Sequence, residues 1–240
     1  MKRIYFFILL SLVSLGFSSC KKKQCIDGDQ YPRGVVRSLP PFTAVNVHFS
    51  GIVELVKDTA KETPFVELIV EENLQTHLAT EVINDTLDIS LGFCFSNHSE
   101  IIVRVHYDKL NTLTVSGPGD IISKGKMVQD DLTLNIRSSG DIDLTTDVKN
   151  LTTNINGTGL VKINGQIEFH QIFHQNSGNI NTYQAMTDSV IANMSGSGNA
   201  YLRIKRHLTL DLSGKGDLYY KGFPNINSNI TGAGKLINDN

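Results

Sequence analysis

LTVSGPGD, residues 113–120, is the stretch that decides the fold, because units similar to it follow one another to the end of the chain. Each unit has a glycine that recurs at intervals of 18 to 21 residues. The equivalent glycines are Gly119, Gly140, Gly159, Gly178, Gly198, Gly216 and Gly234. This interval matches one coil of a β-solenoid and is shorter than helical or propeller repeats.

Apolar and polar residues alternate around this glycine. Two places after it stand Ile121, Ile142, Val161, Ile180, Ala200, Leu218 and Leu236, all apolar. Residues at odd offsets are mostly Thr, Asn, Ser, Arg, Lys and Asp. Because side chains of a strand point alternately to its two faces, this period of two predicts strands with one buried and one exposed face. The repeat therefore predicts an all-β solenoid.

Small residues also occupy the position two places before the repeated glycine. Five of the seven units contain Gly-x-Gly, and the other two carry Ser138 and Asn176. We expect both small positions to point inward at a tight corner where glycine adopts a positive φ, a conformation that Asn176 also tolerates. The predicted corner glycines are Gly51, Gly117, Gly119, Gly140, Gly157, Gly159, Gly178, Gly196, Gly198, Gly214, Gly216, Gly232 and Gly234.

A row of polar residues stands five places before the glycine. Its members are Thr114, Asn135, Asn154, Phe173, Asn193, Asp211 and Asn229. If the coils stack in register, about 4.8 Å apart, these side chains should form an outward ladder of hydrogen bonds.

The solenoid is predicted to cover residues 38–240 as one domain, with regular glycine repeats from residue 113. A first coil is predicted at residues 45–55, around Gly51. Between this coil and the repeats, the β-rich runs 66–70, 87–91 and 101–105 are interpreted as less regular coils. Residues 91–95 are expected to form a loop or cap, and a short helical turn is expected within residues 71–82.

The N-terminus has the pattern of a secretory signal peptide over residues 1–19. Met1-Lys2-Arg3 precedes an apolar run, residues 4–17, that is too short for a comfortable membrane helix. Residues 17–20, FSSC, resemble a bacterial lipobox, which implies a lipid on Cys20 and a membrane as partner. An ordinary cleaved signal peptide is the alternative. Residues 20–37 are interpreted as the lipidated cysteine and a polar tether.

Two cysteines remain after Cys20. Cys25 and Cys94 are an even pair, so a disulfide between tether and solenoid is a candidate in an oxidising compartment. The sequence leaves open whether the two thiols approach within bonding distance.

With the lipobox, the tether and Ser-Gly-x-Gly-Asp units such as 116–120 and 213–217, the chain resembles the autotransporter adhesin head GIN domain family over about residues 38–238. The resemblance implies a right-handed parallel β-helix with about 18–21 residues per coil. It also implies an outer-membrane lipoprotein of the Bacteroidetes type with an adhesin role, facing either the cell surface or the periplasm. It brings no catalytic or binding residues.

Metal and cofactor motifs are not recognisable in the sequence. No zinc, P-loop, Rossmann or nucleophile-elbow pattern is present, and a formal charge of -2 gives no indication of nucleic-acid binding. The row after the glycine begins with Asp120 and Asp141, but Leu160 interrupts it, so a calcium site between coils is disfavoured. His170 and His174 should face the same way about 13 Å apart, too far to share a metal.

The sequence favours a lipid-anchored cell-envelope scaffold without catalysis, whose polar face binds a glycan or a protein. The alternative is a carbohydrate-active β-helix enzyme, a polysaccharide lyase or hydrolase, which should show a cleft with converging acids or bases. Six residues follow Gly234. An uncovered last coil would favour self-association, unless Lys235, Asn238, Asp239 and Asn240 supply a polar end.

Overall fold

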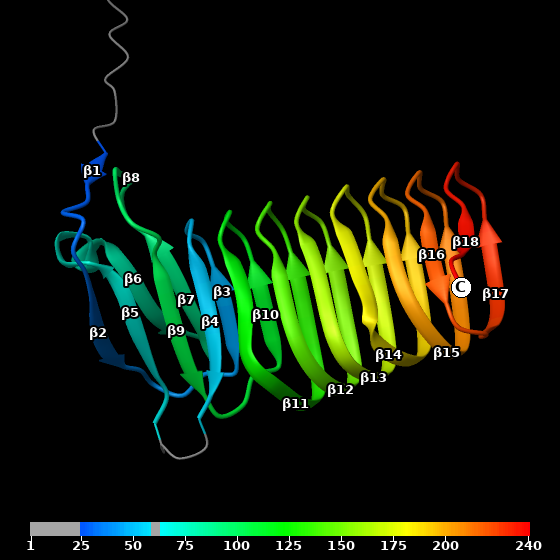
Figure 1. Ribbon diagram of the computed structural model, residues 1–240, viewed down its shortest axis with the longest axis horizontal. Coiled ribbons are helices and arrows are strands. Elements are labelled where there is room, and N and C mark those ends of the chain that lie inside the picture. The colour runs from blue at the N-terminus through cyan, green and yellow to red at the C-terminus, as the bar shows by residue number, and fades with distance from the viewer. Residues whose placement is uncertain (1–24, 59–62) are drawn as a thin grey trace, which may run out of the picture.

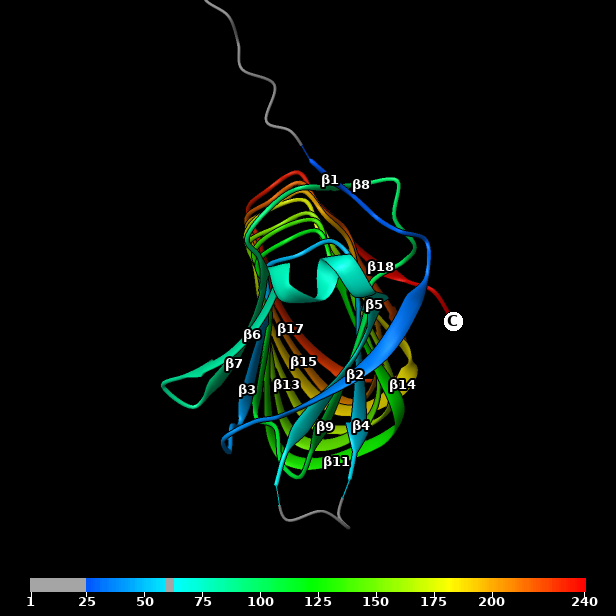
Figure 2. The same cartoon turned by 90° about the vertical axis from the view of Figure 1, so that its left-hand side faces the viewer.

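The computed structural model describes residues 25–58 and 63–240, so the predicted signal peptide and Cys20 lie outside the described part. The described residues form a β-solenoid of about seven turns, as predicted. Its coils stack along one long axis, with the glycine turns along one edge and the bends of the strands along the other (Figure 1). Figure 2 looks at the N-terminal end of this stack.

Each regular coil is built around one long strand that bends midway. These strands are β11 (Asp120–Ile136), β12 (Ile142–Ile155), β13 (Leu160–His174), β14 (Asn179–Met194) and β15 (Ala200–Leu212). The series starts at β10 (Thr112–Val115) and closes at β16 (Leu218–Lys221), β17 (Asn225–Ile230) and β18 (Leu236–Asn238). Neighbours pair in parallel, with Ile121 opposite Ile142 and Ile142 opposite Val161. Equivalent residues of the repeat therefore lie side by side.

Two further coils precede β10, and their strands come from β3 (Ala44–Val47), β4 (Ile52–Lys57), β7 (Thr86–Leu91) and β9 (Ile102–Tyr107). β3 pairs in parallel with β10 and β7, and β4 pairs in parallel with β11 and β9. Val45 lies opposite Leu113, so the coil predicted around Gly51 is in register with the repeats.

An antiparallel cap covers the N-terminal end of the stack. β5 (Phe65–Glu71) runs antiparallel to β9, and β6 (Leu78–Ile83) forms a hairpin with β7. The interpretation of residues 66–70 as a coil strand is therefore wrong, whereas 87–91 and 101–105 do belong to a parallel coil. The helical turn expected within residues 71–82 is the 3₁₀ helix η1 (Glu72–His77). No helix among the described residues is long and apolar enough to cross a bilayer.

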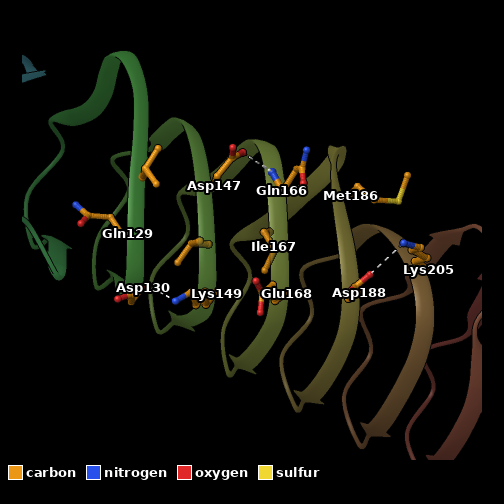
Figure 3. A pocket seen from close by; sticks show the side chains of 12 residues that line it. Gln129, Asp130, Asp147, Lys149, Gln166, Ile167, Glu168, Met186, Asp188 and Lys205 are labelled. Carbon is orange, nitrogen blue, oxygen red and sulfur yellow. Dashed lines mark hydrogen bonds and ion pairs between the residues drawn. The ribbon is translucent and has the colours of Figure 1, made fainter.

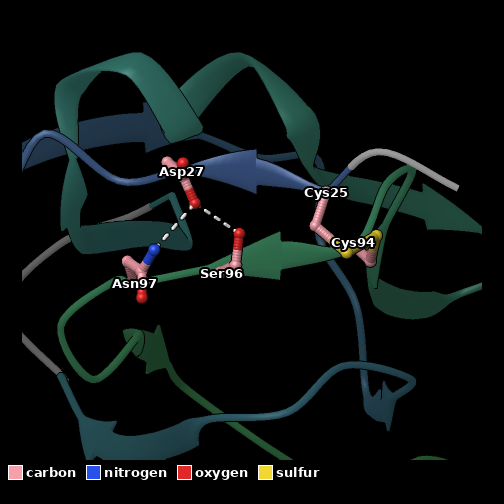
Figure 4. Close-up of a disulfide and its surroundings, with 5 residues drawn as sticks. All are labelled: Cys25, Asp27, Cys94, Ser96 and Asn97. Carbon is pink, nitrogen blue, oxygen red and sulfur yellow. Dashed lines mark hydrogen bonds between the residues drawn. A yellow bond between two sulfur atoms is a disulfide. The ribbon is translucent and has the colours of Figure 1, made fainter. Parts of the chain in front are cut away.

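The described part of the predicted tether belongs to this cap. β2 (Pro32–Ser38) pairs antiparallel with β5 along its whole length. β1 (Ile26–Asp27) pairs with β8 (Phe95–Ser96), where Asp27 accepts hydrogen bonds from Ser96 Oγ (2.5 Å) and Asn97 Nδ2 (3.1 Å). A disulfide joins Cys25 to Cys94, with their Cα atoms 4.8 Å apart (Figure 4). Residues 25–38 are thus held on the folded body.

The core follows the alternation of the sequence. Ile142 and Leu218 are 0% exposed, and the other residues two places after the glycine are also fully buried except Leu236, which is partly exposed. Polar side chains enter this interior as well. They are Thr146, Thr153, His170, His174, Thr182 and Thr187, each 0% exposed. Burial of these apolar rows contributes about 25 cal/mol for each Å² of apolar surface removed from water, which is the main driving force for stacking the coils.

The repeated glycines are required for close stacking rather than for a positive φ. Among the predicted corner positions only Gly51 has a φ in the positive range, at 156°, and Asn176 is not among the residues with positive φ. A Cβ on Gly159 would instead overlap the Gly140 carbonyl oxygen of the preceding coil, and a Cβ on Gly140 would overlap that of Gly119. The corner residue must be glycine because the backbones of successive coils touch there.

Candidate functional site

A groove crosses the bends of the long strands (Figure 3). We call this side of the solenoid the groove corner. It has a volume of about 420 Å³ and extends from β11 to β15. Its lining residues are Val128, Gln129, Asp130, Asp147, Val148, Lys149, Gln166, Ile167, Glu168, Met186, Asp188 and Lys205. At the strand spacing of a β-sheet, about 4.8 Å, five strands span roughly 19 Å along the solenoid axis.

Alternation along the strand gives the groove a floor and two walls. Gln129, Val148 and Ile167 lie opposite one another on β11, β12 and β13 and are buried, so they form the floor. The residues on either side of this row point outward. Val128 (59% exposed) and Met186 (44% exposed) bring apolar surface to one wall. The groove thus combines an apolar base with accessible sides.

Charged side chains of both signs line the walls, and most of them are paired. Lys149 Nζ lies 2.7 Å from Asp130 Oδ1, Lys126 Nζ 2.5 Å from Asp147 Oδ2, and Lys205 Nζ 3.8 Å from Asp188 Oδ1. The hydrogen bond from Lys149 lowers the pKa of Asp130, and the same contact raises the pKa of Lys149. Three of the four lining carboxylates therefore lie beside a cation, and the pKa of Asp130 is lowered by it.

This arrangement suits binding of an extended, hydroxyl-rich chain. The carboxylates can accept hydrogen bonds from hydroxyl groups, the Gln166 amide can accept or donate them, and the lysines donate. The exposed side chains of Val128 and Met186 can contact the C–H faces of such a ligand. A general acid for glycoside cleavage needs a carboxyl whose pKa is raised, whereas that of Asp130 is lowered.

The polar row after the glycine has a structural role in the ladder. Asp120 Oδ1 accepts the Asp141 N–H at 2.8 Å, and Asp141 Oδ1 accepts the Leu160 N–H at 2.7 Å. Further along, the side chains of Asn179, Asn199 and Asp217 each accept the N–H of the next coil. These oxygens, which the calcium hypothesis would need, are therefore already used. The described residues contain no group of three or more His, Cys, Asp or Glu side chains arranged to hold a metal ion.

The row five places before the glycine forms a ladder in two separate parts. Asn154 donates to Asn135 at 2.9 Å, and Asn135 donates to Thr114 at 3.2 Å. Phe173 interrupts the row, and Asn229 then donates to Asp211 at 3.5 Å.

His170 and His174 both face the interior, on the same side of β13. His170 Nε2 lies 2.9 Å from Thr153 Oγ1, and His174 Nε2 lies 2.6 Å from the Gly178 carbonyl oxygen. Burial lowers the pKa of His170 to about 3 and also lowers the pKa of His174. The two side chains are neutral core residues outside the groove.

The C-terminal residues fold back on the last coils. Asp239 Oδ2 accepts the Tyr183 hydroxyl at 2.9 Å, and the Asn240 side chain bonds both the N–H and the carbonyl oxygen of Gly222. Asn238 Oδ1 accepts the Asn240 N–H at 3.1 Å. Asn238, Asp239 and Asn240 thus supply the polar contacts at this end.

The sequence prediction missed the groove, although a signal for it is present. Asp130, Lys149, Glu168 and Asp188 each stand ten places before a repeated glycine, namely Gly140, Gly159, Gly178 and Gly198. Extending the repeat alignment backward from the glycine would therefore have placed these four charged residues in one row.

Known proteins with similar sequences and structures share this architecture. The model of the family described as "Putative auto-transporter adhesin, head GIN domain" matches residues 41–224. A putative adhesin from Bacteroides fragilis is similar in structure, with a TM-score of 0.82 and 19% identity, over 89% of this chain and 99% of that one. A putative lipid binding protein from Parabacteroides distasonis has a TM-score of 0.72 and 20% identity, over 90% and 100% of the two chains. No curated protein matches the sequence.

Proposed function

We propose, from the premise that the chain belongs to the auto-transporter adhesin head GIN domain family, that it is a cell-envelope binding scaffold without catalytic activity. Its ligand is an extended polysaccharide that lies along the groove corner, and a lipid on Cys20 holds the protein on a membrane. The adhesin description of the family supports the binding role.

The groove is the observation that carries this proposal. It crosses several coils along the solenoid axis, so a linear polymer could contact equivalent positions on successive strands. The exposed side chains of Val128 and Met186 provide apolar contact, and the paired charges at Asp130 and Lys149 provide donors and acceptors already fixed in place. A preorganised surface of this kind lowers the entropic cost of binding.

The enzyme alternative has weaker support in the same groove. Asp130 is ion-paired with Lys149, which lowers its pKa, and such a carboxylate is a poor proton donor. Incubation of the purified protein with a bound polysaccharide should leave the chain length unchanged. Release of new reducing ends or unsaturated sugars, abolished by Glu168→Gln, would instead establish an enzyme.

Binding is tested with the purified protein and a panel of immobilised neutral and acidic polysaccharides. Lys149→Gln replaces a charged donor of the groove wall by a neutral one and should weaken binding about tenfold, the effect of losing one hydrogen bond to a charged group. Lys215→Gln is the matched control, because Lys215 is exposed in a glycine turn outside the groove. If both variants lose the same affinity, or if neither loses any, the ligand does not bind in the groove.

The lipid anchor is supported by residues 17–20, FSSC, which lie outside the described residues, and it has an independent test. Cells that express the full chain and are grown with a palmitate analogue should label the wild-type protein and not Cys20→Ala. Cys25→Ala is the control, because Cys25 is joined to Cys94. Protease accessibility on intact cells then shows whether the scaffold faces the medium or the periplasm.

A further inference from the structure

A second hollow continues the groove toward the C-terminal coils. It has a volume of about 480 Å³ and shares Met186 and Lys205 with the groove. The remaining lining residues are Arg203, Ile204, Lys221, Gly222, Phe223 and Asn240. We call this hollow the basic recess, because every charged side chain that lines it is a cation.

The recess exists because the coils become shorter at this point. Between the paired positions Thr182–Leu202 and Ser189–His207, β14 has six residues and β15 only four. The extra residues of β14 include Met186, which is 44% exposed at the edge of the step. Phe223, 89% exposed, follows β16 on the next coil and forms the other edge. A change of coil length thus leaves an open space between two apolar side chains.

The charges around the recess are not balanced. Arg203 lies opposite Lys221 on the neighbouring strand, and the Arg203 guanidinium has no hydrogen bond or ion pair among the described residues. Lys221 Nζ is 3.8 Å from Asp239 Oδ2, and Lys205 shares Asp188 with Arg206. The three lining cations therefore have two carboxylates beside them, and one of these, Asp188, also pairs with Arg206, although the whole chain has a formal charge of -2. Like charges opposite one another on paired strands are destabilising, so an anion between them would be stabilised.

We infer that the basic recess binds the carboxylate of a uronic acid residue, so that the polysaccharide in the groove is an acidic one. Arginine presents two parallel N–H donors that match the two oxygens of a carboxylate. Met186 and Phe223 offer apolar surface to the C–H face of the same sugar ring. This inference rests on the proposed function, because it names the ligand class for a chain that lies in the adjoining groove.

The experiment compares binding of polygalacturonate and its methyl ester, which have the same backbone and differ in charge. The purified protein should bind polygalacturonate about tenfold more tightly than the ester at low salt, a difference typical of one charge-assisted contact. Arg203→Gln should abolish this preference, and added NaCl should reduce it in the wild type. Lys215→Gln, which removes one positive charge from a glycine turn, should retain the preference.

The results separate this inference from the proposed function. If both polymers bind equally, and Lys149→Gln weakens both while Arg203→Gln changes neither, the groove binds polysaccharide and the basic recess does not recognise carboxylates. If neither polymer nor any other polysaccharide binds, the proposed function fails as well. Binding of phosphatidylglycerol vesicles that depends on Arg203, without binding of polygalacturonate, would assign the recess to a membrane surface and overturn the inference. Equal melting temperatures of the variants exclude unfolding as the cause.

Discussion

Each coil has two corners: the glycine corner, where the repeated glycines of successive coils stack, and the groove corner, where the long strands bend. The two differ in how constant the register between successive coils is. Across the glycine corner the register is constant. Ile155, four places before its glycine, lies opposite His174 of the next coil, and Val161, two places after that glycine, lies opposite Ile180. On the groove side, register shifts occur at residues 122–126, 162–164 and 182–189. Differences in coil length are therefore absorbed on one side only.

This difference shows where the fold leaves room for function. At the repeated glycines the backbones of successive coils touch, so no Cβ fits there. Toward the groove corner the chain can gain or lose residues, and the glycines with positive φ, Gly125, Gly165 and Gly222, lie there. The groove and the basic recess both lie on this side.

The largest effect on stability is expected for Gly159→Ala. Its Cβ would overlap the Gly140 carbonyl oxygen, so the coils would have to separate, at a cost of about 3 kcal/mol or more. Gly125→Ala meets no atom within 4 Å, and its cost of about 1 kcal/mol comes from the φ of 121° alone. Urea denaturation of both variants measures the difference. Equal losses would mean that the two corners are equally tight.

Acid should lower the free energy of unfolding through His170, which is buried in the core. His170 has a pKa of about 3 in the folded protein against 6.5 as its ordinary value, so the unfolded chain binds the proton more readily. Stability contributed by neutral His170 is complete above pH 6.5 and falls by about 1.4 kcal/mol per pH unit below it. Urea denaturation at a series of pH values should show a shallower decline for His170→Gln, whereas an unchanged slope would contradict a neutral, buried imidazole.

A smaller effect is expected in the polar row beside the glycine corner. Asp141→Ala leaves the Leu160 N–H without its acceptor and should cost about 1 kcal/mol. Asp141→Asn keeps an oxygen in place, as Asn179 and Asn199 do in later coils, and should be nearly neutral. Thermal unfolding distinguishes the two variants. If Asn is as damaging as Ala, the negative charge itself is needed, as it would be for a cation.

The smallest effect on stability is expected in the groove. Lys149→Gln breaks an exposed ion pair with Asp130, and such pairs contribute little to stability because water screens them. The same change should weaken polysaccharide binding about tenfold, since a charged hydrogen-bond donor is replaced by a neutral one. Chemical denaturation and binding assays on the same preparation test whether the change affects binding without affecting stability. A large loss of stability would show that the groove wall is part of the structural framework.

The solenoid could be predicted from sequence because its determinants are local and repeated. Alternation at Ile142 and Leu218 specifies the inner face, and the glycine spacing specifies the coil. The prediction that the glycines adopt a positive φ was wrong. They are needed because successive coils touch, as at Gly140 and Gly159, and the distance between coils cannot be read from the local sequence.

The cap and the groove could not be predicted for different reasons. Parallel and antiparallel strands share the same period of two, so the run 66–70 gives no indication that β5 is antiparallel to β9. The tether prediction failed because β2 is mostly exposed and polar, yet it pairs with β5. The row of charged residues in the groove can be found in the sequence, but the hollow beside it depends on where the register of the strands shifts, and that is known only from the structure.

The disulfide determines how the protein would respond to mechanical load. A force applied through the residues that precede Cys25 enters the body at the Cys25–Cys94 bond and passes directly to the loop between β7 and β9. β2, which would otherwise be peeled away from β5 one hydrogen bond after another, is bypassed. An adhesin pulled by fluid flow would therefore keep its cap until a covalent bond is reduced.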